Sequence, residues 1–187
     1  MRVQDNHAHG NSGYKAIGLR DFFFLFLNAL ETRYKNYNSL TVHLPYEIQH
    51  PLIYKNSRKG YLFVKWGELI KQLLKINLYW ENAPLEVLGK WNLKWGQMDW
   101  KCVPKNIDLC LDVGHLILES KNLTEARKRV LGILKSRNSQ IKHLHIHVNN
   151  LKDDQHLVSR GKILEVLPDG LFNQLIEGRS YIFETGE

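Results

Sequence analysis

The sequence has no long apolar run. The longest candidate, residues 22–30, is interrupted by Asn28 and is shorter than the ~20 residues that a membrane-spanning helix needs. The first six residues also lack the apolar stretch of a secretion signal. We therefore expect a cytoplasmic protein without a membrane partner.

Cysteine is scarce as well. The chain of 187 residues has only Cys102 and Cys110, which excludes a disulfide framework, and their separation fits no zinc-finger spacing. Internal repeats and low-complexity linkers are also absent, and the length suits one domain with a sizeable core. We expect a single domain over residues 1–187, complete or shortened on its amino-terminal side.

The charge is unbalanced but dispersed. The formal net charge is +7 and the sequence pI is near 9.4. A positive net charge of this kind favours binding to nucleic acid. The basic residues are spread along the chain, however, and net charge alone specifies function weakly. A solvated basic surface is the simpler interpretation, and a nucleic-acid partner stays open.

Short β-type runs alternate with helical stretches, which is typical of an α/β fold with a parallel sheet. Asn122 is placed to cap the third helix, with Glu125 at the position of a capping-box acid. A further strand is expected near residues 15–19, and residues 85–106 form a long, partly helical connection. The predicted strands are residues 39–44, 76–81, 107–113, 141–148 and 180–184, and the predicted helices are residues 21–34, 60–74 and 123–136.

Four of these strands have one apolar and one more polar face, because successive side chains point to opposite sides. Near the carboxyl end of each polar face stands a residue that can bind metal. Ligands bind at this end of parallel strands in open sheets and barrels alike. The mixture of imidazole and carboxylate suits Zn²⁺, Mn²⁺ or Fe²⁺ better than Ca²⁺. The candidates are His43, Glu81, Asp112, His115, His145, Asp154, His156 and Glu184.

Several short motifs carry a resemblance to a known superfamily. Residues 79–84 (YWENAP) resemble the Glu-Asn strand end of the xylose-isomerase-like barrels, which include sugar epimerases and endonuclease IV. Residues 109–115 (LCLDVGH) are similar to the Asp-x-x-His motif of that superfamily, and residues 143–147 (HLHIH) to its next His-bearing strand. Further matches in the same order are residues 43–46, 154–156 with 161–163, and 183–185.

The resemblance, over roughly residues 39–187, implies a sugar or sugar-phosphate isomerase or epimerase. It implies a Mn²⁺ or Zn²⁺ cofactor and a small sugar or sugar phosphate as substrate. Glu81 and Glu184 would also be the catalytic carboxylates that move a proton beside the metal-polarised carbonyl. His43 and His115 would contact the substrate. The implied metal ligands are Glu81, Asp112, His145 and Glu184.

Two alternatives stay open. In the endonuclease IV branch, His43, His115, Asp154 and His156 would hold further zinc ions, and the protein would cleave abasic DNA as a zinc phosphodiesterase. The positive charge favours this alternative. The other alternative is a non-catalytic remnant that binds a metal or a ligand.

The chain also departs from the family pattern. Only 35 positions separate Tyr46 from Glu81, which leaves no room for a strand that the family usually has there. An eight-stranded barrel needs about 250 residues. We therefore expect an abbreviated β/α barrel with five or six recognisable strands, which is a fragment, a degenerate member, or a barrel completed by oligomerisation.

For the remaining histidines and the tryptophans we expect roles other than metal binding. No apolar strand precedes His7 and His9, so a mobile tail is expected there. His143 and His147 are expected to line the site rather than to bind metal. Trp91, Trp95 and Trp100 are typical of loop packing, with stacking on a sugar or base as the alternative.

Overall fold

The computed structural model describes residues 5–8, 17–49, 57–83 and 98–184. Trp91, Trp95 and His9 lie outside these ranges, as does most of the expected connection over residues 85–106. The chain divides into an amino-terminal unit, Gln4–Asp108, and a carboxyl-terminal unit from Leu109 onward. Across the described ranges, no helix combines the length and the apolar character that a membrane crossing requires.

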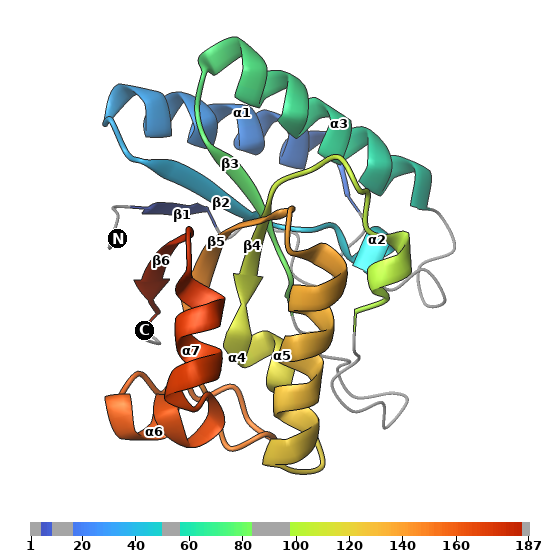
Figure 1. The fold of residues 1–187 in the computed structure, drawn as a ribbon. Coiled ribbons are helices and arrows are strands. Elements are labelled where there is room, and N and C mark those ends of the chain that lie inside the picture. The colour runs from blue at the N-terminus through green and yellow to red at the C-terminus, as the bar shows by residue number, and fades with distance from the viewer. Residues whose placement is uncertain (1–4, 9–16, 50–56, 84–97, 185–187) are drawn as a thin grey trace. The chain divides into compact units, whose positions relative to one another are not determined.

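The amino-terminal unit has three parallel strands, paired in the order β1-β2-β3. His43 ends β2 directly beside Glu81, which ends β3. Two long helices, α1 and α3, lie side by side in this unit (Figure 1). Its strands are β1 (Asp5–Ala8), β2 (Ser39–His43) and β3 (Leu78–Glu81), and its helices are α1 (Leu19–Tyr34), α2 (Tyr46–Gln49), α3 (Ser57–Leu74) and the short 3₁₀ helix η1 (Trp100–Cys102).

Trp80 of β3 fastens α3 to the sheet of this unit. Its side chain is fully buried, and its indole nitrogen donates to Oε1 of Glu68 at 2.8 Å. The Phe63 ring meets it edge-on with 5.8 Å between centroids. A Cβ at Gly67 would stand 2.4 Å from the indole, so glycine is what lets the helix approach the sheet this closely.

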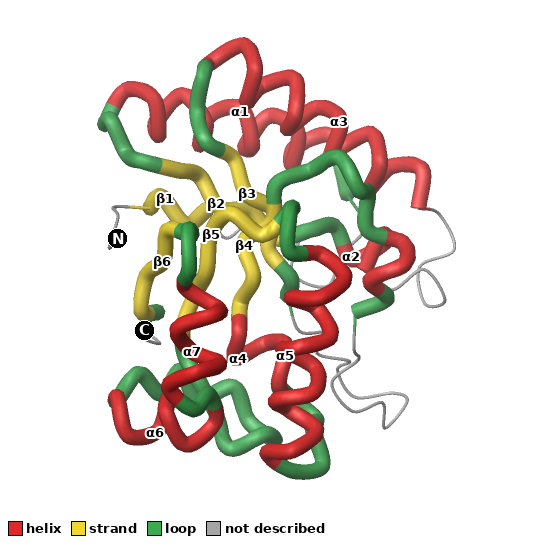
Figure 2. Tube along the Cα trace, in the orientation of Figure 1, coloured by secondary structure: helices red, strands yellow, loops and turns green. Residues whose placement is uncertain are grey.

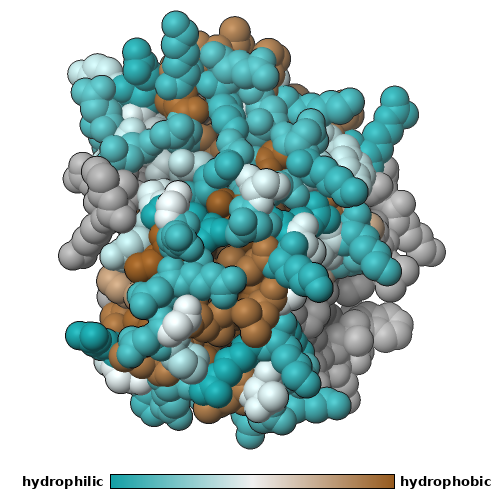
Figure 3. All heavy atoms as spheres, in the orientation of Figure 1, coloured by the Kyte–Doolittle hydropathy of each residue, from teal (hydrophilic) through white to brown (hydrophobic). Residues whose placement is uncertain are grey.

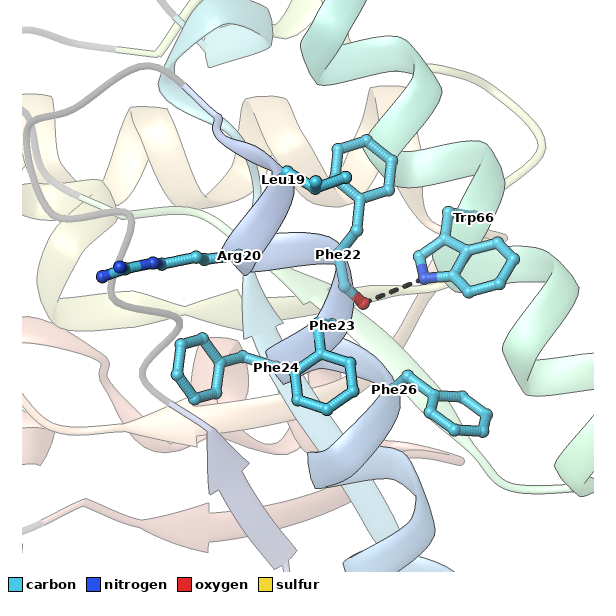
Figure 4. Close-up of a pocket in the computed structure, with 7 residues that line it drawn as sticks. All are labelled: Leu19, Arg20, Phe22, Phe23, Phe24, Phe26 and Trp66. Atoms are coloured by element: carbon cyan, nitrogen blue, oxygen red, sulfur yellow. Dashed lines mark hydrogen bonds between the residues drawn. The ribbon is translucent and has the colours of Figure 1, made fainter.

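Helix α1 carries apolar side chains on its exposed side as well as on its buried side. Leu25 and Ala29 are buried, whereas Phe23 is 60% exposed. The Trp66 indole of α3 donates to the backbone carbonyl of Phe22 at 3.1 Å. Phe26 points to the side of α1 on which Trp66 lies (Figure 4). The two helices border a groove of about 690 Å³ lined by Leu19, Arg20, Phe22, Phe23, Phe24, Phe26 and Trp66.

The carboxyl-terminal unit has three parallel strands in the order β4-β5-β6. Strand β4 runs straight into α4 without a loop (Figure 2). The register sets Asp112 beside His145, and His145 beside Ile182. The strands are β4 (Leu109–Asp112), β5 (Ile141–Ile146) and β6 (Ser180–Phe183), and the helices are α4 (Val113–Ile117), α5 (Leu123–Arg137), α6 (Arg160–Val166) and α7 (Asp169–Ile176).

Strand β4 is buried on both faces, and β5 is buried except for Lys142. Burial on both sides is typical of parallel strands, so the polar face of β4 and β5 is part of an interior and not a wetted surface. The visible outer surface is largely hydrophilic, with apolar side chains gathered between α5 and α7 (Figure 3).

The N-terminus of α5 confirms one cap and corrects another. The Asn122 side chain accepts a hydrogen bond from the backbone N–H of Glu125 at 3.0 Å, as predicted. The Glu125 carboxylate, however, accepts from the N–H of Lys121 at 3.0 Å and not from that of Asn122. The acid also pairs with Arg129 at 2.7 Å, and both contacts lower its pKa.

The α/β class and the five predicted strands are confirmed, each within two residues at either end. The expected strand near residues 15–19 is wrong, because Leu19 begins α1. The sixth strand is β1, which includes His7, so the expectation of a mobile tail there is wrong as well. Strand β2 pairs directly with β3, and only the helices α2 and α3 occur in the described parts of the chain between them.

Candidate metal centre

Asp112 is the last residue of β4, directly before α4, and it contacts two histidines of the carboxyl-terminal unit. Its Oδ1 accepts a hydrogen bond from the backbone N–H of His115 at 2.7 Å, which caps α4. The His147 Nε2 lies 2.9 Å from Oδ1 and 3.0 Å from Oδ2. The carboxyl group is fully buried. Burial raises its pKa, and the nearby His115 and His147 oppose that rise.

A second carboxylate approaches from β6. The Glu184 Oε2 lies 3.2 Å from Nδ1 of His145, which is itself fully buried. Asp112, His145 and Glu184 each offer one ligand atom, and these atoms lie within 4.8 Å of one another. The unit therefore brings together three of the four predicted ligands, as one imidazole and two carboxylates.

A second donor group adjoins the first. Asp154 connects its histidines: its Oδ2 lies 3.2 Å from Nε2 of His115 and 3.4 Å from Nε2 of His156. The imidazoles of His147 and His156 are stacked, with 4.0 Å between centroids and an interplanar angle of 5°. One ligand atom each of His115, His147, Asp154 and His156 lies within 4.8 Å of the others.

These residues fit a divalent cation. Nδ1 of His147, Oδ1 of Asp154 and Nδ1 of His156 are buried without a hydrogen-bond partner among the described residues, a state that normally costs about 1–3 kcal/mol per group. Three such atoms in one cluster are explained if a cation is their partner. Imidazole and carboxylate together suit Zn²⁺ or Mn²⁺.

The backbone around the second group leaves no room for larger side chains. A Cβ at Gly114 would stand 1.9 Å from Cε1 of His147. The Asn149 side chain donates to the carbonyl of Gly114 at 2.8 Å, which ties the loop after β5 to α4. Val148 and Leu157 close that loop through an antiparallel bridge, so Asp154 and His156 are carried on a segment fixed at both ends.

The Asp154–His156 pair has opposed pKa shifts. Burial alone would raise the pKa of Asp154, but hydrogen bonds and charge from His115 and His156 hold it well below its ordinary 3.8. The Asp154 carboxylate raises the pKa of His156 above its ordinary 6.5 against the opposing effect of burial. In the metal-free protein, both shifts therefore favour the charged forms of the pair.

This pair predicts how the stability of the metal-free protein depends on pH. The contribution of His156 is complete below pH 6.5 and is lost as the pH rises through its raised folded-state pKa. The contribution of Asp154 is present above pH 3.8 and is lost as the pH falls through its lowered pKa. In chelator, the stability of wild type minus that of His156→Asn should fall as the pH rises above 6.5 in denaturant titrations. A difference that is constant or grows with pH would contradict the assignment.

The remaining predicted residues lie in the amino-terminal unit. The Glu81 carboxylate is fully buried, and its Oε2 lies 3.4 Å from Nε2 of His43. Gln49 braces these strand ends: its amide donates to the carbonyl of Leu44 and accepts from the N–H of Ala83. Glu81 and His43 thus form a pair of their own, and the part of Glu81 in the metal site stays a prediction.

Comparison with known proteins found no match for this chain. No family description matches it, and neither does any curated protein or solved structure. The assignment of a function therefore depends on the residues of the site.

The structure adds His147 to the possible donors, whereas the sequence predicts it as a lining residue. The signal was present, because His143, His145 and His147 alternate along the predicted strand over residues 141–148 and would share a face. What the sequence alone did not show is that α4 approaches the His147 ring so closely that only glycine fits at position 114, beside the contact between His147 and Asp112.

Proposed function

We propose that this protein is a divalent-metal enzyme that hydrolyses a phosphate ester, built on an abbreviated barrel of the xylose-isomerase-like type. The endonuclease IV side of the resemblance now ranks first, ahead of the isomerase. Parallel strands with metal-binding residues at their carboxyl ends support the barrel, and the net charge of +7 suits an anionic substrate.

The observation that carries this proposal is the pair of donor groups around Asp112. An isomerase that uses one metal needs Asp112, His145 and Glu184 but has no use for four further donors. The Asp112 carboxylate is a member of the first group and also contacts His147 of the second. Two adjoining donor groups are what a two-metal site requires, and such sites are common in phosphodiesterases.

The solvent exposure of each side chain indicates the role that it would take in this reaction. When bound, divalent cations would activate water and neutralise charge on the phosphoryl group. Asp112 and His145 are fully buried and hold fixed positions. The Glu184 side chain is 11% exposed, as expected for the carboxylate that borders the substrate and exchanges a proton with it. His115 and Asp154 orient each other through their contact at 3.2 Å.

The isomerase or epimerase is the second candidate, and Glu184 is the observation that favours it. A partly exposed carboxylate beside a buried imidazole is suited to removing a proton from carbon next to a metal-bound carbonyl. This reaction would require only the first donor group. It would incorporate solvent deuterium into a sugar, whereas phosphate ester hydrolysis would not.

Metal stoichiometry and a matched pair of variants test the proposal. Wild type loaded with Mn²⁺ should bind two ions and cleave bis(p-nitrophenyl) phosphate and an abasic-site oligonucleotide. Asp154→Asn should bind one ion and lose at least 100-fold in cleavage, because the second group would be lost. The neighbouring, exposed Asp153→Asn is the control and should behave as wild type. One ion in wild type with deuterium exchange on sugars would favour the isomerase, and no bound ion would refute both enzymes.

A further inference from the structure

A third cluster of possible metal ligands lies on β4 and β5, two residues before Asp112 on β4 and two residues before His145 on β5. Cys110 stands beside His143 in the register of β4 and β5, as Asp112 stands beside His145. One ligand atom each of Cys110, His143 and His145 lies within 4.8 Å of the others, and all three residues are buried. The proposed function uses neither Cys110 nor His143.

The chemistry of this cluster differs from that of the two donor groups described around Asp112. One sulfur and two imidazole nitrogens form a soft donor set, which suits Zn²⁺ and other thiophilic cations and is poorly suited to Mg²⁺ or Mn²⁺. Structural and catalytic zinc sites combine the same ligand types at tetrahedral positions.

His143 is oriented as a metal-binding histidine would be. Its Nδ1 lies 2.7 Å from the Ser180 hydroxyl of β6, so one ring nitrogen is held by a partner on the neighbouring strand. Its Nε2 is fully buried on the other side of the ring. Histidine ligands usually engage their second nitrogen in such a contact, which fixes the tautomer and the direction of the ring. The His145 ring crosses that of His143 at 85°, with 5.3 Å between centroids.

We propose that Cys110, His143 and His145 form a thiolate site for a zinc-type cation. The Cys110 thiol releases its proton to solvent when the cation binds, and the cation takes the sulfur electron pair. The site does not depend on the proposed function. One consequence does: a neutral imidazole has a single lone pair for a metal, so a cation held here withdraws His145 from Asp112 and Glu184. A thiophilic cation would therefore inhibit the enzyme.

Cobalt spectroscopy on the full chain tests the site, and the second cysteine provides the control. Metal-free protein titrated with Co²⁺ should develop a thiolate-to-cobalt charge-transfer band in the near ultraviolet. Cys102→Ser should keep this band, because Cys102 lies on η1 in the other unit. Cys110→Ser should lose it, and His143→Asn should weaken Co²⁺ binding at least 10-fold. Unchanged near-ultraviolet circular dichroism of the metal-free variants shows that they fold.

The outcomes separate this proposal from the previous one. The band should persist in His156→Asn even if the chain hydrolyses no phosphate ester. A band that survives Cys110→Ser, or that disappears with Cys102→Ser, overturns the thiolate site. Competition is measured with Mn²⁺, which avoids thiolates and is followed by electron paramagnetic resonance. One equivalent of Cd²⁺ should displace Mn²⁺ from wild type but not from Cys110→Ser, and equal displacement in both would refute the sharing of His145.

Discussion

Asp112→Asn is expected to lower the affinity for Mn²⁺ by on the order of 100-fold or more, since even residues that only orient metal ligands cost 10–100-fold when replaced. Phosphate ester cleavage should fall below detection. Asparagine retains an oxygen for the N–H of His115, so the cap of α4 survives. Burial already raises the pKa of Asp112, so a neutral side chain is tolerated there without metal.

The metal-free variant should therefore unfold within about 3 kcal/mol of wild type, which is the upper range for a hydrogen bond to a charged group. Equilibrium dialysis against Mn²⁺ measures the binding, and urea titration in chelator measures the stability. Asp153→Asn is again the matched control, since Asp153 is exposed. An Asp112→Asn protein that binds Mn²⁺ as wild type does would show that the donor groups lie elsewhere.

Gly114→Ala is expected to destabilise the protein by about 2 kcal/mol, which is typical of overpacking a full interior. The added methyl would stand 1.9 Å from Cε1 and 2.2 Å from Nδ1 of His147. That ring contacts Asp112 on one side and is stacked on His156 on the other. It can move only by giving up one of these contacts, so the second metal should be lost along with stability.

Gly132→Ala is the control, because it lies in α5 with nothing within 4 Å of the added carbon. Alanine is favoured over glycine in a helix by about 1 kcal/mol, so this variant should be slightly more stable than wild type. Urea titrations of both variants decide the matter. If the two substitutions shift the midpoint in the same direction, the close approach of α4 to His147 does not constrain the site.

The fold was readable from the sequence wherever an element is apolar. Residues 39–44 and 141–148 alternate apolar and polar side chains, and both form strands within two residues of the predicted ends. Strand β1 was missed because its residues, DNHA, offer no apolar alternation. It forms by pairing with β2, which is a property of the neighbour and not of the segment.

The site was readable to the extent that strand ends converge. The prediction that Asp112, His145 and Glu184 share one edge follows from parallel pairing, and the structure brings them together. The pairing of His147 with Asp112 was not readable, because it depends on the distance between a loop and a helix. The soft cluster was also missed, since Cys110 and His143 become neighbours only through the register of β4 and β5.

The position of Asp112 has a consequence for following the metal in solution. The same carboxylate that would bind the cation accepts the N–H of His115 at 2.7 Å. If the carboxylate turns toward an ion, this amide loses its acceptor, and the first turn of α4 loosens or finds another partner. Exchange of one backbone proton with deuterated water would then record each arrival and departure of the metal, in an assay that needs neither a substrate nor a coloured ion.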